Sequence, residues 1–170
     1  MISVILGIDP GSRITGYGLI EVNGQQLTYL DSGCIRTQTN ELSQRLLEIF
    51  NGVCWLMETY APQQAAIEQV FMHQNPSAAL KLGHARGVAM VACATHRIPV
   101  SEYSPRQIKQ SLVGYGGAEK NQVKQMVMRI LNLNKPPQVD AADALATAIC
   151  HHHTQSGLLA RIVATTRSIG

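Results

Sequence analysis

Four acidic residues lie in stretches of sequence that are otherwise apolar, and they limit the possible folds more than any other feature. They are Asp9, Glu68, Asp140 and Asp143. Moving an isolated carboxylate out of water is so costly that the group either finds a partner or shifts its pKa until it is neutral. The fold must therefore supply each of these side chains with a partner.

Each acidic residue alone has a structural explanation. Asp9 could accept hydrogen bonds from turn amides, Asp140 could cap a helix, and Glu68 could pair with an arginine. Together they indicate more, because strand ends and a helix start can converge, and Asp140 and Asp143 share a helical face. Converging carboxylates repel unless divalent cations neutralise them, and an all-oxygen ligand set suits Mg²⁺ or Mn²⁺. The sequence therefore predicts metal-dependent chemistry.

Apolar alternation predicts strands, and apolar residues at helical spacing predict helices. The expected strands are 4–8, 14–22, 27–35, 65–70 and 99–103. The expected helices lie between Asn40, as N-cap, and Pro62, and at 76–96, 105–113, 119–131 and 139–152. The order βββαβαβααα predicts an α/β fold with a mixed five-stranded sheet flanked by helices. We expect one domain over 1–154 and a frayed tail at 155–170.

The expected helix 76–96 carries small residues at helical spacing, namely Ala79, Gly83 and Gly87. A glycine inside a helix costs about 1 kcal/mol relative to alanine unless a close contact requires it. The contacting backbone is either the sheet or the same helix of a second subunit, since a two-fold dimer brings one patch against itself.

Composition excludes several classes of protein. The 170-residue chain is 45% hydrophobic and 15% charged, which excludes a disordered chain. No apolar run approaches the about 20 residues of a membrane span, and no basic leader precedes the first apolar run, so we expect a cytoplasmic protein. The four cysteines form no C-x-x-C pair and are expected to be buried thiols. Consecutive helical residues point in different directions, so His151, His152 and His153 are not expected to bind a metal.

Basic residues are concentrated in the middle of the chain. Segment 69–139 holds nine basic and two acidic residues, whereas 1–68 holds three basic and seven acidic ones. Such a segment indicates a polyanionic partner, with a solvated helical face as the alternative. Two metal ions about 4 Å apart can activate water and stabilise the leaving oxygen in a phosphoryl displacement. The carboxylates and the basic segment together predict cleavage of a nucleic-acid backbone, and the sequence has no G-x-S-x-G nucleophile motif.

Several short motifs follow one another along residues 4 to about 150. In order they are Gly7-Ile8-Asp9-Pro10-Gly11-Ser12 with Gly16-Tyr17-Gly18, Ile67-Glu68-Gln69-Val70-Phe71, Asn75-Pro76, Leu82-Gly83-His84-Ala85-Arg86-Gly87, Tyr103-Ser104-Pro105 with Lys109, Gly114-Tyr115-Gly116 with Ala118 and Lys120, and Asp140-Ala141-Ala142-Asp143-Ala144-Leu145-Ala146. In identity and spacing these motifs resemble those of the RuvC family of Holliday-junction resolvases.

The resemblance implies an RNase H-like fold, a homodimer, and Mg²⁺-dependent, symmetrical cutting of two like-polarity strands in a four-way DNA junction. It implies two Mg²⁺ ions per site, with Mn²⁺ able to substitute, and RuvA and RuvB as partners. The implied metal ligands are Asp9, Glu68, Asp140 and Asp143, and the implied catalytic cations are Lys109 and Lys120. Phe71 is expected to stack on a junction base. Further expected DNA contacts from the basic segment are Lys81, Arg86, Arg106 and Lys124.

Two alternatives and one choice stay open. A junction-binding protein without catalysis would use the basic segment alone, although the presence of all four carboxylates argues against it. Asp9-Pro10-Gly11-Ser12 also resembles the first phosphate loop of actin-like sugar kinases and ATPases, but the chain is too short for their second half. Water on a metal ion already has a lowered pKa, so no protein base is strictly required, and either Asp143 or a phosphate oxygen of the substrate could assist.

Overall fold

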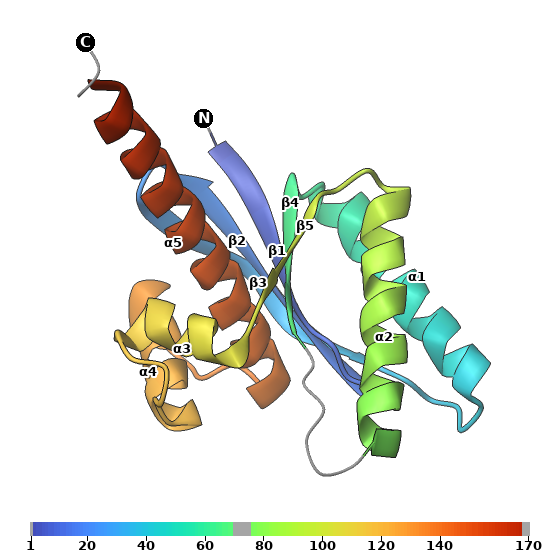
Figure 1. The fold of residues 1–170 in the computed structure, drawn as a ribbon. Helices are drawn as coiled ribbons and strands as arrows, with labels where there is room; N and C mark the ends of the chain where they lie inside the picture. Colours follow the sequence, from blue (N-terminus) through green and yellow to red (C-terminus); the bar gives the residue numbers. More distant parts are fainter. Residues whose placement is uncertain (1, 70–75, 168–170) are drawn as a thin grey trace.

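The computed structural model describes residues 2–69 and 76–167, with side chains as far as residue 157. In these ranges strands and helices follow the predicted order, as Figure 1 shows. The elements are β1 (Ile2–Asp9), β2 (Ile14–Asn23), β3 (Gln26–Arg36), α1 (Leu42–Tyr60), β4 (Gln64–Glu68), α2 (Pro76–Thr95), β5 (Val100–Tyr103), α3 (Pro105–Val113), α4 (Lys120–Ile130) and α5 (Val139–Arg167).

The five strands form one mixed sheet in the order β3-β2-β1-β4-β5. The first three strands make an antiparallel meander, while β4 runs parallel to β1 and β5 runs parallel to β4. The ends of β1 and β4 therefore lie side by side at one edge of the sheet. This arrangement confirms the predicted mixed five-stranded α/β sheet.

Helices cover both faces of the sheet (Figure 1). Helices α3, α4 and α5 lie over one face, and α1 and α2 lie over the other. Neighbouring residues of β1 serve different faces, since Ile5 belongs to the core under α5 and Leu6 to the core under α1 and α2. Both side chains are almost fully buried. The alternation explains why an unbroken apolar run forms a central strand with two cores.

Helix α5 lies very close to the sheet because glycines face it. Gly7 of β1 and Gly18 of β2 are paired in register. A Cβ atom on Gly7 would lie 2.0 Å from the carbonyl oxygen of Ala144, and one on Gly18 would lie 2.6 Å from Cγ of Leu145. No other side chain fits at these two positions without moving the helix.

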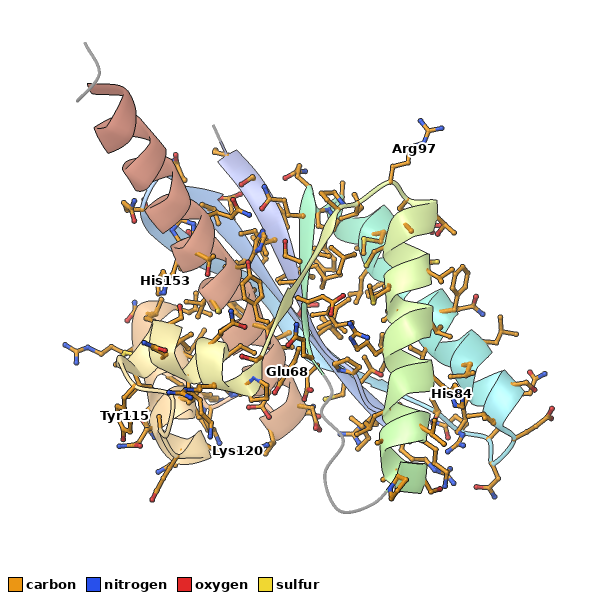
Figure 2. All side chains as sticks on the ribbon, in the orientation of Figure 1. Glu68, His84, Arg97, Tyr115, Lys120 and His153 are labelled. Atoms are coloured by element: carbon orange, nitrogen blue, oxygen red, sulfur yellow. The ribbon has the colours of Figure 1, made fainter. Side chains whose placement is uncertain are left out.

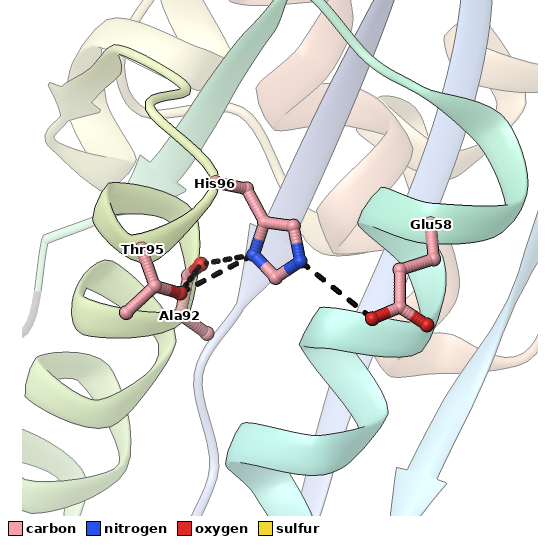
Figure 3. A network of polar contacts seen from close by, with 4 residues as sticks. All are labelled: Glu58, Ala92, Thr95 and His96. Atoms are coloured by element: carbon pink, nitrogen blue, oxygen red, sulfur yellow. Dashed lines mark hydrogen bonds and ion pairs between the residues drawn. The ribbon is translucent and has the colours of Figure 1, made fainter.

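The helices of the other layer pack on a shared apolar core, and a polar contact also joins them (Figure 3). At the end of α2, the Nδ1 atom of His96 donates a hydrogen bond to the carbonyl oxygen of Ala92 at 3.0 Å. Its Nε2 atom lies 3.8 Å from Oε1 of Glu58 on α1. Figure 3 shows the imidazole ring between the two helices near their carboxyl ends.

The structure corrects the predicted start of α1. Its N-cap is Glu41, whose side chain makes no capping hydrogen bond, and Asn40 is not the cap. The side-chain oxygen of Asn40 instead accepts a hydrogen bond from Arg13 Nη2 at 2.8 Å. Asn40 therefore connects the loop before α1 to the turn between β1 and β2.

Helix α5 is longer than predicted. It continues to Arg167 instead of ending near residue 152, and so it includes most of the segment 155–170 that was expected to fray. No proline interrupts residues 139–167, and without such a breaker the helical hydrogen bonding continues. Within the described ranges, no helix combines the length and the apolar character that crossing a bilayer requires.

The small residues of α2 are divided between two faces. Ala85 and Ala89 are fully buried against the sheet. A Cβ atom on Gly83 or Gly87 would meet nothing within 4 Å. The two glycines therefore do not contact the sheet, and the expectation that the sheet packs against them is wrong.

Candidate active site

The candidate site lies at the edge of the sheet where β1 and β4 end. Asp9 is the last residue of β1 and Glu68 the last of β4. Their neighbours Ile8 and Ile67 are paired in the parallel ladder. Because parallel strands present their carboxyl ends at the same edge, the two carboxyl groups are brought together by strand pairing alone.

Helix α5 brings the other two carboxylates to this edge. Asp140 and Asp143 lie in its first turns. A Cβ atom on Gly16 of β2 would lie 2.1 Å from the carbonyl oxygen of Asp140 and 3.0 Å from its Cβ atom. Gly16 is paired with Asp9 in register. The missing side chain at Gly16 thus lets the helix start lie directly beside Asp9.

A pocket of about 290 Å³ opens at this point. Acidic groups from the sheet and α5 and basic groups from α3 and α4 line it together. The lining residues are Asp9, Glu68, Pro105, Ile108, Lys109, Lys120, Val123, Asp143 and Ala146. The pocket contains three of the four predicted metal ligands and both predicted catalytic lysines. Ile108 and Val123, which were not predicted to line it, are buried apolar residues of α3 and α4.

Burial and mutual repulsion make the deepest carboxyl groups weak acids. Burial, and then the charges of Glu68, Asp143 and Asp140, raise the pKa of Asp9 to about 8. Burial, and then the charge of Asp143, raise the pKa of Glu68 to about 7. The nearby Lys120 lowers both values, and Lys109 also lowers that of Glu68, without cancelling the rise.

Two short helices carry the lysines into the pocket. Helix α3 begins with a capping box in which the Ser104 side chain accepts from the Gln107 amide, followed by Pro105 at the first helical position. This cap fixes the direction of the helix and so the position of Lys109. Lys120 is the first residue of α4. Its Nζ atom donates to Oδ2 of Asp143 at 3.1 Å, and that contact raises the pKa of Lys120.

The donor set fits divalent cations. It consists of carboxylate oxygens alone, which suits Mg²⁺ or Mn²⁺, and a bound cation would relieve the repulsion that raises the pKa values of Asp9 and Glu68. Among the described residues, no three histidine, cysteine, aspartate or glutamate side chains are already arranged to hold an ion.

The other predicted DNA-contacting residues are spread more widely. Phe71 lies outside the described residues. Arg106 and Lys81 are exposed on α3 and α2, and Lys124 is half-buried on α4. Arg86 on α2 forms an ion pair with Glu102 of β5. This predicted DNA contact therefore already has a carboxylate partner within the protein.

The histidine run does not gather around a common point. Both ring nitrogens of His151 are engaged, since Nδ1 lies 2.9 Å from the hydroxyl of Tyr103 and Nε2 lies 2.5 Å from Oε1 of Gln64. His153 Nδ1 instead lies 3.0 Å from the hydroxyl of Ser111. Burial lowers the pKa values of His151 and His152. The run therefore joins α5 to the sheet and to α3.

The cysteines are less uniformly buried than predicted. All four are free thiols. Cys93 and Cys150 are buried, as expected, whereas Cys34 and Cys54 are only partly buried. Cys34 lies opposite Gly16 and belongs to β3, the outermost strand of the sheet, where one side of the strand has no neighbouring strand among the described residues.

Comparisons with known proteins agree with this geometry. The sequence profile of the family described as "Crossover junction endodeoxyribonuclease RuvC" matches residues 5–151. The RuvC of Legionella pneumophila (strain Lens) is 63% identical over 157 residues, which cover 92% of this chain and 90% of that protein. The RuvC of Acinetobacter baylyi is 57% identical over 155 residues, covering 91% and 86%.

A solved structure is similar over nearly the same length. The structure of T. thermophilus RuvC in complex with a Holliday junction substrate has a TM-score of 0.85 and 33% identity, covering 91% of this chain and 95% of that one. The likeness confirms the RNase H-like fold that the motifs imply. A profile match over most of the chain and relatives at these identities lead to one conclusion: the chain belongs to the RuvC family of crossover junction endodeoxyribonucleases.

Proposed function

We propose that this chain is a metal-dependent endodeoxyribonuclease that resolves four-way DNA junctions by paired, symmetrical cuts. The ligatable nicks that it leaves would serve recombination and DNA repair. The observation that carries the proposal is a single pocket in which Asp9, Glu68 and Asp143 face Lys109 and Lys120. The choice of a junction as substrate is supported by the RuvC relative whose structure contains one.

The acidic residues are the proposed cation ligands. Asp9, Glu68, Asp140 and Asp143 would hold two Mg²⁺ ions, with Mn²⁺ as a substitute. Bound divalent cations would neutralise these carboxylates and activate the water that attacks phosphorus. Because the pKa values of Asp9 and Glu68 are raised to about 8 and about 7, both groups must lose their protons before they can act as ligands.

The lysines are the proposed partners of the scissile phosphate. Lys109 and Lys120 enter the pocket from α3 and α4, opposite the sheet edge. Their ammonium groups would contact the non-bridging oxygens and stabilise the negative charge that develops during displacement. Lys120 contacts Asp143 at 3.1 Å, so it must exchange this carboxylate for the phosphate when DNA enters.

Cleavage of a synthetic, immobile four-way junction tests the proposal. Wild-type protein should make paired, ligatable nicks on opposed strands in Mg²⁺ and none in EDTA, and should spare a linear duplex. Asp9→Asn should bind the junction without cutting it. Glu21→Gln, a carboxylate-to-amide change on β2 away from the pocket, is the matched control and should cut normally. Equal cutting of linear duplex would leave a general nuclease, and wild-type binding without cutting would leave a junction-binding protein.

We also propose that the active form is a homodimer assembled through the outer face of α2. Gly83 and Gly87 lie on this face, and a Cβ atom at either would meet nothing within 4 Å. Leu80 and Val91, one turn to either side, are 65% and 55% exposed. An apolar helix face with glycines at its centre allows a second helix backbone to approach closely. Two copies related by a two-fold axis would present one pocket to each of two opposed strands.

The wider setting follows from the family. RuvA and RuvB, the branch-migration proteins, are the proposed partners, and the bacterial cytoplasm is the proposed location, because the chromosomal junctions lie there. Co-purification of the chain with RuvA and RuvB on a junction, compared with junction DNA alone, tests the first part.

A further inference from the structure

The loop between α3 and α4 carries an exposed aromatic side chain. Tyr115 is 49% exposed, and it follows Gly114, which ends α3 with a left-handed φ of 92°. The proposed catalytic and dimer roles do not use it. Figure 2 shows Tyr115 and Lys120 on the part of the molecule formed by α3, α4 and the loop between them, which we call the α3–α4 lobe. Glu68 lies at the neighbouring end of the sheet.

The Tyr115 ring is held in place although it is exposed. Its hydroxyl donates to Oε1 of Gln122 at 2.8 Å. The same oxygen accepts from the backbone amide of Glu119 at 2.8 Å as part of the capping box that begins α4. The hydroxyl is therefore bound to a group that is itself fixed by the helix start. A ring held this way presents a flat face to solvent at little cost in side-chain entropy.

Basic side chains lie near the loop that carries this ring and on the helices on either side of it. The Arg106 side chain lies across Gly116, where a Cβ atom would be 3.1 Å from Nε. Lys109 and Lys120, from the helices on either side of the loop, line the pocket. Residues 104–138 contain six basic side chains and a single acidic one, Glu119. A flat aromatic face among guanidinium and ammonium groups fits a nucleic-acid strand, because bases stack on the ring while cations bind the phosphates.

We propose that Tyr115 stacks on a nucleobase of the DNA strand that passes over the α3–α4 lobe beside the cut. The proposal rests on the function proposed above, since it needs a branched DNA whose bases are accessible. In this proposal Tyr115 contacts a base of the strand, while the nearby Lys109 and Lys120 contact its phosphate. Because stacking strength differs between bases, Tyr115 would also influence which sequences are cut.

Two substitutions separate stacking from support of the loop. Tyr115→Phe keeps the ring and loses the hydrogen bond to Gln122, and Tyr115→Leu keeps an apolar side chain and loses the ring. Fluorescence anisotropy in EDTA measures binding to the junction and to a linear duplex. Loss of one base–aromatic stack predicts about 5- to 150-fold weaker junction binding for Tyr115→Leu. Near-normal junction binding is expected for Tyr115→Phe, and no change on duplex for either variant.

A direct probe completes the test. With 2-aminopurine beside the cut site, wild type and Tyr115→Phe should quench its fluorescence on binding, and Tyr115→Leu should not. Equal losses for both variants, or an equal loss on linear duplex, would overturn the stacking role. Wild-type protein that fails to prefer the junction over duplex would instead overturn the proposed function itself. Thermal melting of the three proteins checks that the exposed substitutions leave the fold intact.

Discussion

The carboxyl groups of Asp9 and Glu68 lie half-buried among other carboxylates, and this raises their pKa values to about 8 and about 7. Between its ordinary pKa of 3.8 and the raised value, Asp9 holds a proton in the folded state that the unfolded state has released. Folding stability without cations therefore falls as the pH rises through this interval. The proposed metal ligands therefore also make the stability of the cation-free protein depend on pH.

Asp9→Asn should remove part of this sensitivity. Melting temperatures in EDTA should fall less between about pH 4 and about pH 8, the interval between the ordinary and the raised pKa of Asp9, for the variant than for wild type. The difference should reach several degrees, since about 1 kcal/mol shifts the melting temperature of a domain this size by about 2–4 °C. Glu21→Gln is the control. Identical pH profiles for wild type and Asp9→Asn would contradict the raised pKa.

Lys120→Ala should have opposite effects on two properties. Cleavage should slow by about 100-fold, because a positive group that stabilises developing phosphate charge is lost. Mn²⁺ should bind several-fold more tightly without DNA, because the ammonium group no longer occupies Asp143. Single-turnover cleavage and Mn²⁺ titration by electron paramagnetic resonance measure the two effects. Lys109→Ala, which removes a pocket charge without this contact, should change Mn²⁺ binding less; an equal change would refute competition at Asp143.

At this scale the unusual setting of the acidic residues is visible in the sequence, whereas the contacts of the basic residues are not. A carboxylate in an apolar strand is costly wherever it lies, so Asp9 and Glu68 could be recognised from their neighbours alone. A lysine or arginine on a helix is equally at home in water, against DNA or beside a carboxylate. The pairing of Arg86 with Glu102 depends on α2 lying next to β5, which no local pattern encodes.

The contact between α5 and the first two strands is the element-level feature on which the site depends. Gly7, Gly16 and Gly18 together leave room for the helix. Because Asp140 and Asp143 begin this helix, a shift of its first turns moves two proposed ligands at once. Tight packing here links stability to catalysis.

Gly7→Ala should therefore reduce both folding stability and cleavage activity. The added Cβ would lie 2.0 Å from the carbonyl oxygen of Ala144, a backbone atom that cannot move alone. Overpacking of this kind costs about 1–3 kcal/mol. Gly157→Ala, at an open position of the same helix, should be neutral or stabilise by up to about 1 kcal/mol. Urea denaturation with a parallel cleavage assay measures both variants, and unchanged stability of Gly7→Ala would contradict the close contact.

Element boundaries were predictable where the chain carries strong breakers. Pro62 and Pro105 lie just after α1 and at the start of α3, because proline's missing amide hydrogen restricts it to helix ends. Asn40 misled because its amide is used by Arg13, a partner distant in sequence. The end of α5 was placed too early because the threonine, serine and glycine residues after Gln155 lower helix propensity without stopping a helix.

At the scale of the whole molecule, the proposed dimer depends on the outer face of α2. Gly87→Glu should convert the protein to monomers, because a charged side chain would stand where a second backbone must approach. Light scattering after gel filtration should give the mass of one chain, 18.5 kDa, for the variant and about twice this for wild type. The variant should also nick junctions singly instead of in pairs.

Gly157→Glu provides the matched control, since it introduces the same side chain at another open helical glycine. It should keep the mass of wild type and the paired cuts. A monomeric wild-type protein, or a Gly87→Glu variant with unchanged mass, would show that this face does not form the interface.

The two layers of helices contact each other mainly through the sheet. Mutations in α3 and α4, which border the proposed catalytic pocket, therefore lie apart from the α2 face that would join two subunits. Over evolutionary time, preference for the cut sequence can drift while assembly is preserved, and the subunit contact can be remodelled while the chemistry is preserved. A mutant library restricted to α3, α4 and the loop between them could therefore be screened for a changed cut sequence without changing subunit assembly.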